Sequence, residues 1–412
     1  MAAEQAVAAA RALDGLLAAG TDLGPLMGVP IAVKDLFAVD GMPTTAGSNL
    51  DVTDLIGAEG RFVTALKCAG CVILGKTRTV EFALGTTGIS TPRGTPWNPW
   101  DAETQRIPGG SSSGSAVATA AGLCAFAIGT DTGGSVRLPA HFCGTFGLKT
   151  TAGLWPTDGV FPLARDLDSI GPLTRTAADA AIVFAVLTGQ PTPKARPLRS
   201  LRLGRPGNYF YDNLDADVEA CMSAALAMLE AAGTDIVPID VPEAPEREKY
   251  FPVALPADLI SVLGRDRFLA GRERMDPVVA ARGAKGLEVM AAEVMQLKWR
   301  RRQLCAAAEA RFEGLDGWVT PSAAVAAVPV AEFNDLENSM RLTLGITQDT
   351  QPGNLLGLCA TTTPIQMLGS ALPVGLQVLC PANREARALA IALAIEGLVG
   401  PPPRPDLAGF LA

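Results

Sequence analysis

The sequence predicts an α/β protein in which helices cover a mostly parallel or mixed β-sheet. Between positions 1 and 180, short apolar runs typical of strands alternate with amphipathic segments typical of helices. The same alternation resumes after the proline-rich stretch at 190–200, which is therefore a connection rather than a domain linker. Hydrophobic residues make up 48% of the 412 residues and charged residues 18%, which is typical of a protein with a large core. We therefore expect one large domain over residues 1–412.

The individual elements follow from the same patterns. The early part of the chain predicts helices at 1–20 and 61–70. It predicts strands at 28–37 and 71–77. The later part predicts the strands LRLGRP, GWVTPSAAV and ALPVGLQVLC and the helices 215–233 and 383–398. Residues 241–312 are more helical and more charged, so we expect them to lie outside the central sheet, where they could cover a site.

Charge and apolar content exclude several classes of protein. The 34 basic and 42 acidic residues give a net charge of −8 with no basic block, which disfavours nucleic acid or an anionic membrane as a partner. The N-terminus lacks the features of a signal peptide, and no run of about 18 apolar residues could span a membrane. The eight cysteines lie in apolar contexts typical of reduced, buried thiols, so we expect a cytoplasmic protein.

Two short motifs point to functions that their contexts do not support. Residues 70–77, GCVILGKT, match the phosphate-binding pattern G-x-x-x-x-G-K-T. That loop needs flexible residues after a strand, whereas Cys-Val-Ile-Leu is typical of a strand itself, so nucleotide binding is not expected. Cys68 and Cys71 form C-x-x-C, but the sequence offers no second cysteine or histidine pair to complete a zinc site.

The scarcity of histidine narrows the catalytic mechanisms. His141 is the only histidine, so a Ser-His-Asp triad could use no other base and a three-histidine zinc site is impossible. His141 lies between small and apolar residues in LPAHFCG, where a hydrogen-bonded packing role is the favoured interpretation. A serine nucleophile would then need a different base, and lysine is the natural alternative.

A lysine base must be neutral at the working pH. Lowering its pKa from about 10.4 to about 7 costs about 4 kcal/mol and requires burial or cationic neighbours. Lys34 ends the apolar stretch GVPIAVKDLF and is the first candidate, with an ion pair to an acid such as Asp35 as the alternative role. Lys149, in GLKTT, is the second candidate, for which a structural role after the glycine loop is favoured.

Two loops rich in glycine and serine are candidates for the site. RIPGGSSSGSAVATAAGL, at 106–123, runs directly into a buried helix, so its turn presents hydroxyls and amides at a helix N-terminus. GTDTGGS, at 129–135, follows the apolar run CAFAIG. Its glycines permit a close approach of the backbone, so the amides of Thr132, Gly133, Gly134 and Ser135 could turn toward one point as an oxyanion hole.

These motifs resemble the amidase signature family. The resemblance rests on PGGSSSGSA, which contains Ser111, on GTDTGGSVRLPA, which contains Ser135, and on VKD upstream of both. It extends through MPTTAGS, GLKTT, LDSIGPLTRT and ALPVGLQV, and it is densest from about residue 28 to 180. Position 113 is Ser where many relatives have Gly. The resemblance implies a single domain with a central mixed sheet covered on both faces by helices.

The resemblance implies a Ser-cisSer-Lys triad. In it Ser135 is the nucleophile, Ser111 is the bridging serine and Lys34 is the base. The peptide bond between Gly110 and Ser111 is expected to be cis. Asp131 is expected to orient the glycine loop, and Arg137 either fixes that loop, which is the favoured role, or meets a substrate carboxylate.

The activity implied by the resemblance is hydrolysis of a small-molecule carboxamide through an acyl-enzyme on Ser135, without a cofactor or a metal ion. A homodimer is compatible with it. The alternative is the A subunit of a glutamyl-tRNA amidotransferase, which releases ammonia from glutamine and works with partner chains.

Substrate pockets are expected around residues 82–90, 155–166 and 241–312. The candidate residues for an acidic group are Arg165 and Arg137, and those for an aryl or alkyl group are Trp155, Phe161 and Phe251.

Overall fold

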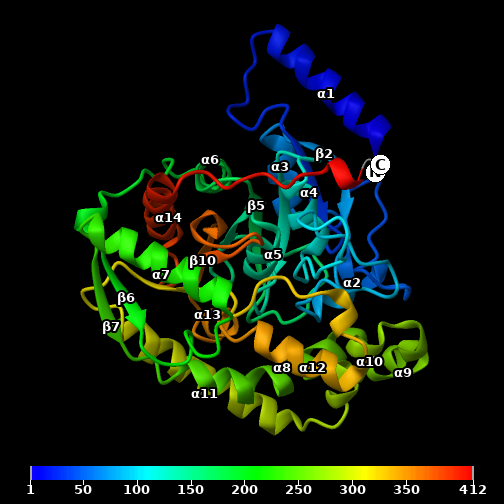
Figure 1. The fold of residues 1–412 in the computed structure, drawn as a ribbon. Coiled ribbons are helices and arrows are strands. Elements are labelled where there is room, and N and C mark those ends of the chain that lie inside the picture. Colours follow the sequence, from blue (N-terminus) through cyan, green and yellow to red (C-terminus); the bar gives the residue numbers. More distant parts are fainter. Residues whose placement is uncertain (1, 411–412) are drawn as a thin grey trace.

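The computed structural model describes residues 2–410, which fold around one ten-stranded mixed sheet (Figure 1). The strand order is β2-β1-β3-β5-β4-β9-β10-β8-β6-β7. The strands are β1 (Pro30–Lys34), β2 (Val72–Thr77), β3 (Phe126–Asp131), β4 (Phe146–Lys149), β5 (Ser169–Thr174), β6 (Arg202–Pro206), β7 (Asp235–Ile239), β8 (Gly317–Pro321), β9 (Cys359–Pro364) and β10 (Gly375–Cys380). The predicted mixed sheet is confirmed.

Strand direction changes across the sheet. β1 runs parallel to β2 and β3 at one edge, and β6 runs parallel to β7 and β8 at the other. The pairs between these edges are antiparallel. Every residue of the six central strands, β3 to β8 in the strand order, is buried, and most of their side chains are apolar or small. The edge strand β7 contains Pro238, which is tolerated there because an edge strand leaves amide positions unpaired.

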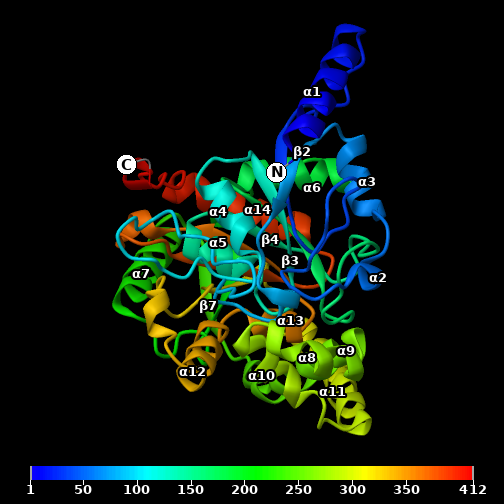
Figure 2. The same cartoon turned by 90° about the vertical axis from the view of Figure 1, so that its right-hand side faces the viewer.

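Helices cover both faces of the sheet. α4 packs against α5 and α6 packs against α14, and each of these pairs also contacts strands. In Figure 2, α4 and α5 lie on one side of the central strands, and α3 and α6 lie on the other. The helices are α1 (Ala3–Ala18), α2 (Thr53–Ile56), α3 (Arg61–Cys68), α4 (Ser113–Ala120), α5 (Arg137–Cys143), α6 (Ala177–Thr188), α7 (Ala216–Ala231), α8 (Arg247–Leu263), α9 (Arg265–Gly271), α10 (Pro277–Lys285), α11 (Ala291–Ala310), α12 (Leu336–Ile346), α13 (Gln351–Leu355) and α14 (Glu385–Val399). Within residues 2–410, no helix combines the length and the apolar character that crossing a membrane requires.

The helices α8 to α11 form a layer of their own between β7 and β8 in the chain. Both views draw this layer below the sheet and α1 above it (Figures 1 and 2). The position agrees with the expectation that residues 241–312 lie outside the central sheet. α12 packs against α10 and extends the layer.

The GCVILGKT segment is a strand, as its residues predict. β2 covers Val72–Thr77, so the positions that would form a phosphate-binding loop are extended and pair with β1. β2 is the edge strand of the sheet, and its backbone is extended rather than folded into a loop. The phosphate-binding interpretation therefore lacks its structural basis.

Candidate active site

Lys34 lies at the end of β1 with its side chain fully buried. Its Nζ donates hydrogen bonds to the Oγ of Ser111 and the Oγ1 of Thr130, both at 2.7 Å. The alternative ion pair with Asp35 is not formed, because the Asp35 carboxylate pairs with Lys76 at 3.0 Å. The structure therefore joins Lys34 and Ser111, which are 77 residues apart in the chain.

Burial changes the acidity of Lys34. Desolvation lowers the pKa of its ammonium group from 10.5 to about 7, against the opposing charges of Asp131 and Asp168. A substantial fraction of Lys34 is therefore neutral near pH 7, as a base requires.

Ser111 is held in a tight turn between β2 and α4. The peptide bond Gly110–Ser111 is cis, as expected. The Ser111 carbonyl accepts hydrogen bonds from the amide of Val80 at 3.2 Å and from the Oγ1 of Thr79 at 2.9 Å. The Gly110 amide donates to the Thr86 carbonyl at 2.7 Å. These bonds fix the turn so that the Ser111 hydroxyl faces Lys34.

Ser135 lies in the loop between β3 and α5 and is 3% exposed. The segment that carries Ser111 touches this loop, because the amide of Ser112 donates to the Ser135 carbonyl at 3.3 Å. Across residues 2–410, the Oγ of Ser135 forms no side-chain hydrogen bond. The two serine segments are thus brought together through their backbones.

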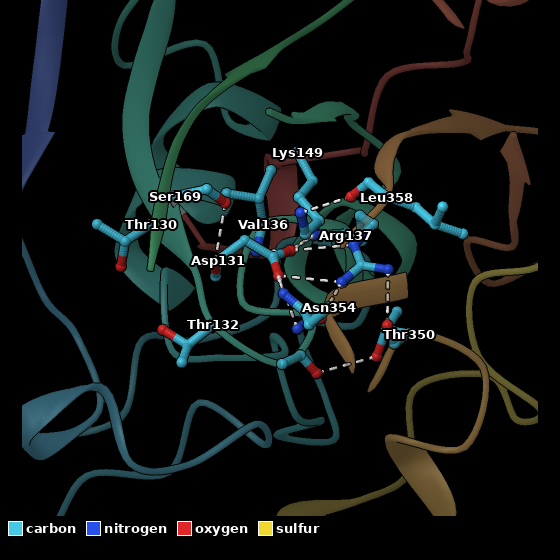
Figure 3. Close-up of polar contacts among 12 residues, drawn as sticks. Thr130, Asp131, Thr132, Val136, Arg137, Lys149, Ser169, Thr350, Asn354 and Leu358 are labelled. Carbon is cyan, nitrogen blue, oxygen red and sulfur yellow. Dashed lines mark hydrogen bonds and ion pairs between the residues drawn. The ribbon is translucent and has the colours of Figure 1, made fainter. Parts of the chain in front are cut away.

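Asp131 organises the Ser135 loop from its fully buried position at the end of β3. Its carboxylate accepts hydrogen bonds from the amides of Gly134 at 2.9 Å and Val136 at 3.1 Å. It also accepts a hydrogen bond from Asn354 at 2.8 Å and forms an ion pair with Arg137 at 3.0 Å. Figure 3 shows the Asp131 carboxylate beside Val136, Arg137 and Asn354.

Arg137 is fully buried and engages all three of its guanidinium nitrogens. Beyond Asp131, it donates to the Thr350 carbonyl at 2.8 Å and to the Oε1 of Gln377 at 2.7 Å. This arrangement leaves Arg137 no donor for a substrate carboxylate, and the loop-fixing role is the one that its contacts support.

The expectation for Gly134 as an oxyanion donor needs correction. Its amide donates to Asp131 and is therefore not free for a substrate oxygen. Across residues 2–410, the amides of Thr132, Gly133 and Ser135 form no hydrogen bond. Gly134 is still required, since its φ is +120° and a Cβ there would lie 2.3 Å from the Oγ1 of Thr350.

Asp168 is a site residue that the motif reasoning did not single out, although it lies within LDSIGPLTRT. Its carboxylate accepts a hydrogen bond from the Oγ1 of Thr132 at 2.6 Å and from the amides of Leu163 and Ala164. Burial raises the pKa of this carboxyl to about 6, and its charge acts on Lys34. Thr130, the second partner of Lys34, was likewise not predicted.

The segment before β9 supplies further residues for which the sequence carried no signal. Thr350 donates from its Oγ1 to the Gly133 carbonyl at 3.1 Å, and Asn354 donates to Asp131. Gln351 lies beside Gly133, where a Cβ would be 3.4 Å from the Gln351 Cγ. These residues lie at the start of α13 or within it, and they contact the Ser135 loop and Asp131.

His141 and Lys149 have the structural roles that the sequence favoured. The Nδ1 of His141 accepts from the Gly375 amide and its Nε2 donates to the Val325 carbonyl, both at 3.0 Å. Burial lowers the pKa of His141 to about 4, so the ring is neutral at pH 7. Lys149 donates to the carbonyl of Leu358 at 2.7 Å (Figure 3).

The residues expected to receive a substrate lie in different places. Phe161 and Arg165 line a cavity of about 30 Å³ together with Thr130, Thr132 and Asp168. Phe251 lines a second cavity near Gly133. Trp155 instead packs on Phe62 in the core, with ring centroids 5.2 Å apart, so it does not receive a substrate.

Comparisons with known proteins agree with this geometry. A sequence profile described as "Amidase" matches residues 1–389. The chain is 40% identical to 2-amino-5-chloromuconic acid deaminase of Comamonas testosteroni, over 96% of this chain and 87% of that protein. It is 34% identical to the A subunit of the glutamyl-tRNA(Gln) amidotransferase of Synechococcus sp. (strain RCC307), over 94% and 87%. A crystal structure of an amidase superimposes with a TM-score of 0.87 at 31% identity, over 96% and 90%. The chain therefore belongs to the amidase family and is a hydrolase that acts on carbon–nitrogen bonds.

Proposed function

We propose that the protein hydrolyses a small-molecule carboxamide through an acyl-enzyme on Ser135, with Ser111 and neutral Lys34 as the proton relay. The observation that carries this proposal is the hydrogen bond of 2.7 Å between the Lys34 Nζ and the Ser111 Oγ. A lysine that is fully buried and titrates near pH 7 has the properties of a general base rather than of a structural cation.

The chemistry begins with two coupled proton transfers. Lys34 takes the proton of Ser111 while Ser111 takes that of Ser135, and the Ser135 Oγ attacks the amide carbon. The resulting oxyanion is stabilised by the amides of Thr132, Gly133 and Ser135, which have no other acceptor among residues 2–410. The proton returns along the relay to the leaving nitrogen as the carbon–nitrogen bond breaks. Water then cleaves the acyl-enzyme with the same relay as base.

Asp131 and Asp168 support this sequence from different positions. Asp131 holds the loop that carries Ser135, so it preorganises the oxyanion donors. Asp168 holds the Thr132 side chain and favours the protonated state of Lys34 that follows proton uptake. Both are positioning residues.

The alternative function is that of the A subunit of an amidotransferase. The chain is less similar to that protein, at 34% identity, than to the deaminase, at 40%. The name of the deaminase describes ammonia release from a free small acid, which supports a stand-alone enzyme here. Glutaminase activity stimulated by tRNA, together with a co-purifying partner chain, would favour the alternative instead.

Substitution of Ser135 tests the proposal. The activity is measured as ammonia or amine release from a panel of primary amides, anilides, ureas, carbamates and esters. Ser135→Ala and Lys34→Ala are expected to abolish turnover, whereas Ser113→Ala serves as the matched control and is expected to retain it. Ser113 is the first residue of α4, two residues after Ser111, and its Oγ only approaches the Arg78 carbonyl at 3.4 Å. Wild-type turnover by Ser135→Ala would refute the assignment.

We also propose that residues 1–412 act as one unit in which the helical segment 241–312 covers the substrate. A cytoplasmic location is supported by the eight cysteines, all of which are free thiols and six of which are buried. A small-molecule amide is the proposed partner.

A further inference from the structure

Two adjoining cavities lie between the loop at 82–90 and the helices α8, α10 and α12. Their volumes are about 260 and about 90 Å³. Thr86, Arg282 and Thr343 line both, so the cavities meet at these side chains. Together they form a continuous hollow beside the candidate active site.

Residues that line the two cavities contact the loops that carry the catalytic serines. Val80 lines the larger cavity and its amide binds the Ser111 carbonyl, and the Thr86 carbonyl binds the Gly110 amide. On the other side, Phe251 and Gln351 line the smaller cavity. A Cβ at Gly133 would lie 3.4 Å from both the Phe251 ring and the Gln351 Cγ. A substrate in these cavities would therefore lie next to the loops that carry Ser111 and Ser135.

Arg282 is a cation without an acidic partner at the junction of the cavities. Its Nη1 donates to the Leu84 carbonyl at 3.1 Å, and within residues 2–410 it forms no ion pair. Burial lowers the pKa of its guanidinium to about 10. Arg282 is half-buried, and a partly desolvated cation without a counter-ion is unfavourable, so an anionic ligand at this point would be stabilising.

The other polar groups around Arg282 are hydrogen-bond donors or can act as donors. The Oγ1 of Thr86 is buried with no hydrogen-bond partner, and Thr86 itself is only 8% exposed. The Oε1 of Gln351 accepts from the Nη1 of Arg247 at 2.9 Å, which leaves the amide NH₂ of Gln351 to donate. Lys285 adds a second cation, and the smaller cavity has no acidic side chain in its lining.

The larger cavity does contain two acidic residues, but both are engaged elsewhere. Asp276 accepts hydrogen bonds from the amides of Val278 and Thr91, at 3.0 Å each. Asp335 accepts from the amide of Asn338 at 2.8 Å. Both carboxylates thus cap helix N-termini, where the helix dipole offsets their charge.

We propose that the preferred substrate carries a carboxylate remote from the scissile amide, and that Arg282 binds this carboxylate at the junction of the two cavities. This inference rests on the proposed function and adds to it the class of substrate. The guanidinium would form charge-assisted hydrogen bonds to the carboxylate, with Thr86 as a further donor. The aliphatic chain between the carboxylate and the amide would run along Phe251 toward Gly133.

Paired substrates test this proposal. The monoamides of short dicarboxylic acids are compared with uncharged primary amides of the same chain lengths, using kcat/KM. Wild-type enzyme is expected to prefer the acidic member of each pair. Arg282→Gln should lower kcat/KM for the acidic members about 10- to 100-fold, because a charged hydrogen bond is lost, while the uncharged members change little. Arg282→Lys should retain part of the preference. Arg274→Gln, at an exposed arginine of the same region, is the control and should have no effect.

Several results would overturn the proposal. One is an equal loss of kcat/KM for the acidic and the uncharged member of each pair in Arg282→Gln. That result would mean that Arg282 has only a structural role, through its hydrogen bond to the Leu84 carbonyl. Another is a wild-type preference for the uncharged members. If Arg282→Gln does not fold, calorimetry on Ser135→Ala and on Ser135→Ala with Arg282→Lys measures binding of the acidic amides directly, and unchanged affinity would also refute the proposal. Absence of turnover for every amide by wild-type enzyme would instead refute the proposed function.

Discussion

The carboxylate of Asp131 and the guanidinium of Arg137 lie 3.0 Å apart, and neither side chain is exposed to solvent. Burial by itself would raise the pKa of Asp131, but the charge and hydrogen bonds of Arg137 lower it well below its usual value. Its folded-state pKa is therefore below the unfolded value of 3.8, so its contribution to stability is present above that pH and is lost as the pH falls. The Asp131–Arg137 pair fixes the Ser135 loop, because Asp131 also accepts hydrogen bonds from the amides of Gly134 and Val136.

Asp131→Asn is expected to destabilise the fold by about 3 to 5 kcal/mol, because it leaves Arg137 buried without a counter-ion. Urea unfolding at neutral pH measures this loss. The control is Asp158→Asn, which breaks the exposed ion pair with Arg61 and should change stability little. A loss for Asp131→Asn no larger than that of the control would show that the buried pair contributes little.

The pH dependence of catalysis is expected to report Lys34. Because the base must be neutral, kcat/KM for an uncharged amide should rise with pH through about 7, which is the pKa of Lys34, and then level off. Asp168→Asn should move this rise to lower pH, because the Asp168 carboxylate favours protonated Lys34. If kcat/KM of Asp168→Asn rose at the same pH as that of wild type, the assignment of this rise to Lys34 would be contradicted.

Lys34 is also expected to reduce the stability of the fold. Its folded pKa of about 7 lies below the ordinary value of 10.5, so between these values the unfolded state binds the extra proton and stability rises with pH. Lys34→Met should therefore be more stable than wild type at about pH 7, by up to about 4 kcal/mol. The gain should shrink as the pH approaches 10.5. Thermal unfolding across this range measures it, and a gain independent of pH would contradict the linkage.

Much of the fold could be predicted from local patterns. The apolar run CVILGKT becomes β2, and the periodic stretch at 215–233 becomes α7. The order of the strands could not be predicted in the same way. β4 pairs with β9, although β5 to β8 and most of the helices lie between them in the chain. No local property of either strand encodes that pairing.

The candidate site likewise contains some residues that could be predicted from the sequence and others that could not. Lys34, Ser111 and Ser135 lie in dense motifs, so the sequence could name them. Thr350 lies 217 residues from its partner in the Ser135 loop, and Asn354 lies 223 residues from Asp131, in a stretch without periodicity or unusual composition. Their importance comes from burial against the Asp131–Arg137 pair, which only the folded chain creates. The role of the Gly134 amide could not be predicted either, because glycine permits that amide to face either way.

Glu81 is another buried carboxylate, and its hydrogen bonds connect Ser48 with the N-terminus of α10. The Oε1 of Glu81 accepts a hydrogen bond from the Ser48 hydroxyl, and its Oε2 accepts one from the Asp276 amide, both at 2.6 Å. Asp276 in turn caps α10, the helix that carries Arg282. Burial raises the pKa of Glu81 from 4.5 to about 7. The group therefore changes charge within the range in which the enzyme is expected to work.

The folded pKa of Glu81 is above its unfolded value of 4.5. Its contribution to the stability of the fold is therefore fully present below pH 4.5 and is lost as the pH rises through about 7. Glu81→Gln keeps an acceptor for the Asp276 amide without the buried charge. It should match wild type at about pH 4.5 and exceed its stability by up to about 3 kcal/mol at about pH 8, measured by urea unfolding at both values. Glu288→Gln, at an exposed position after α10, is the control and should show no such dependence. A Glu81→Gln variant that is less stable than wild type at the higher pH would mean that the charged carboxylate itself holds α10 in place.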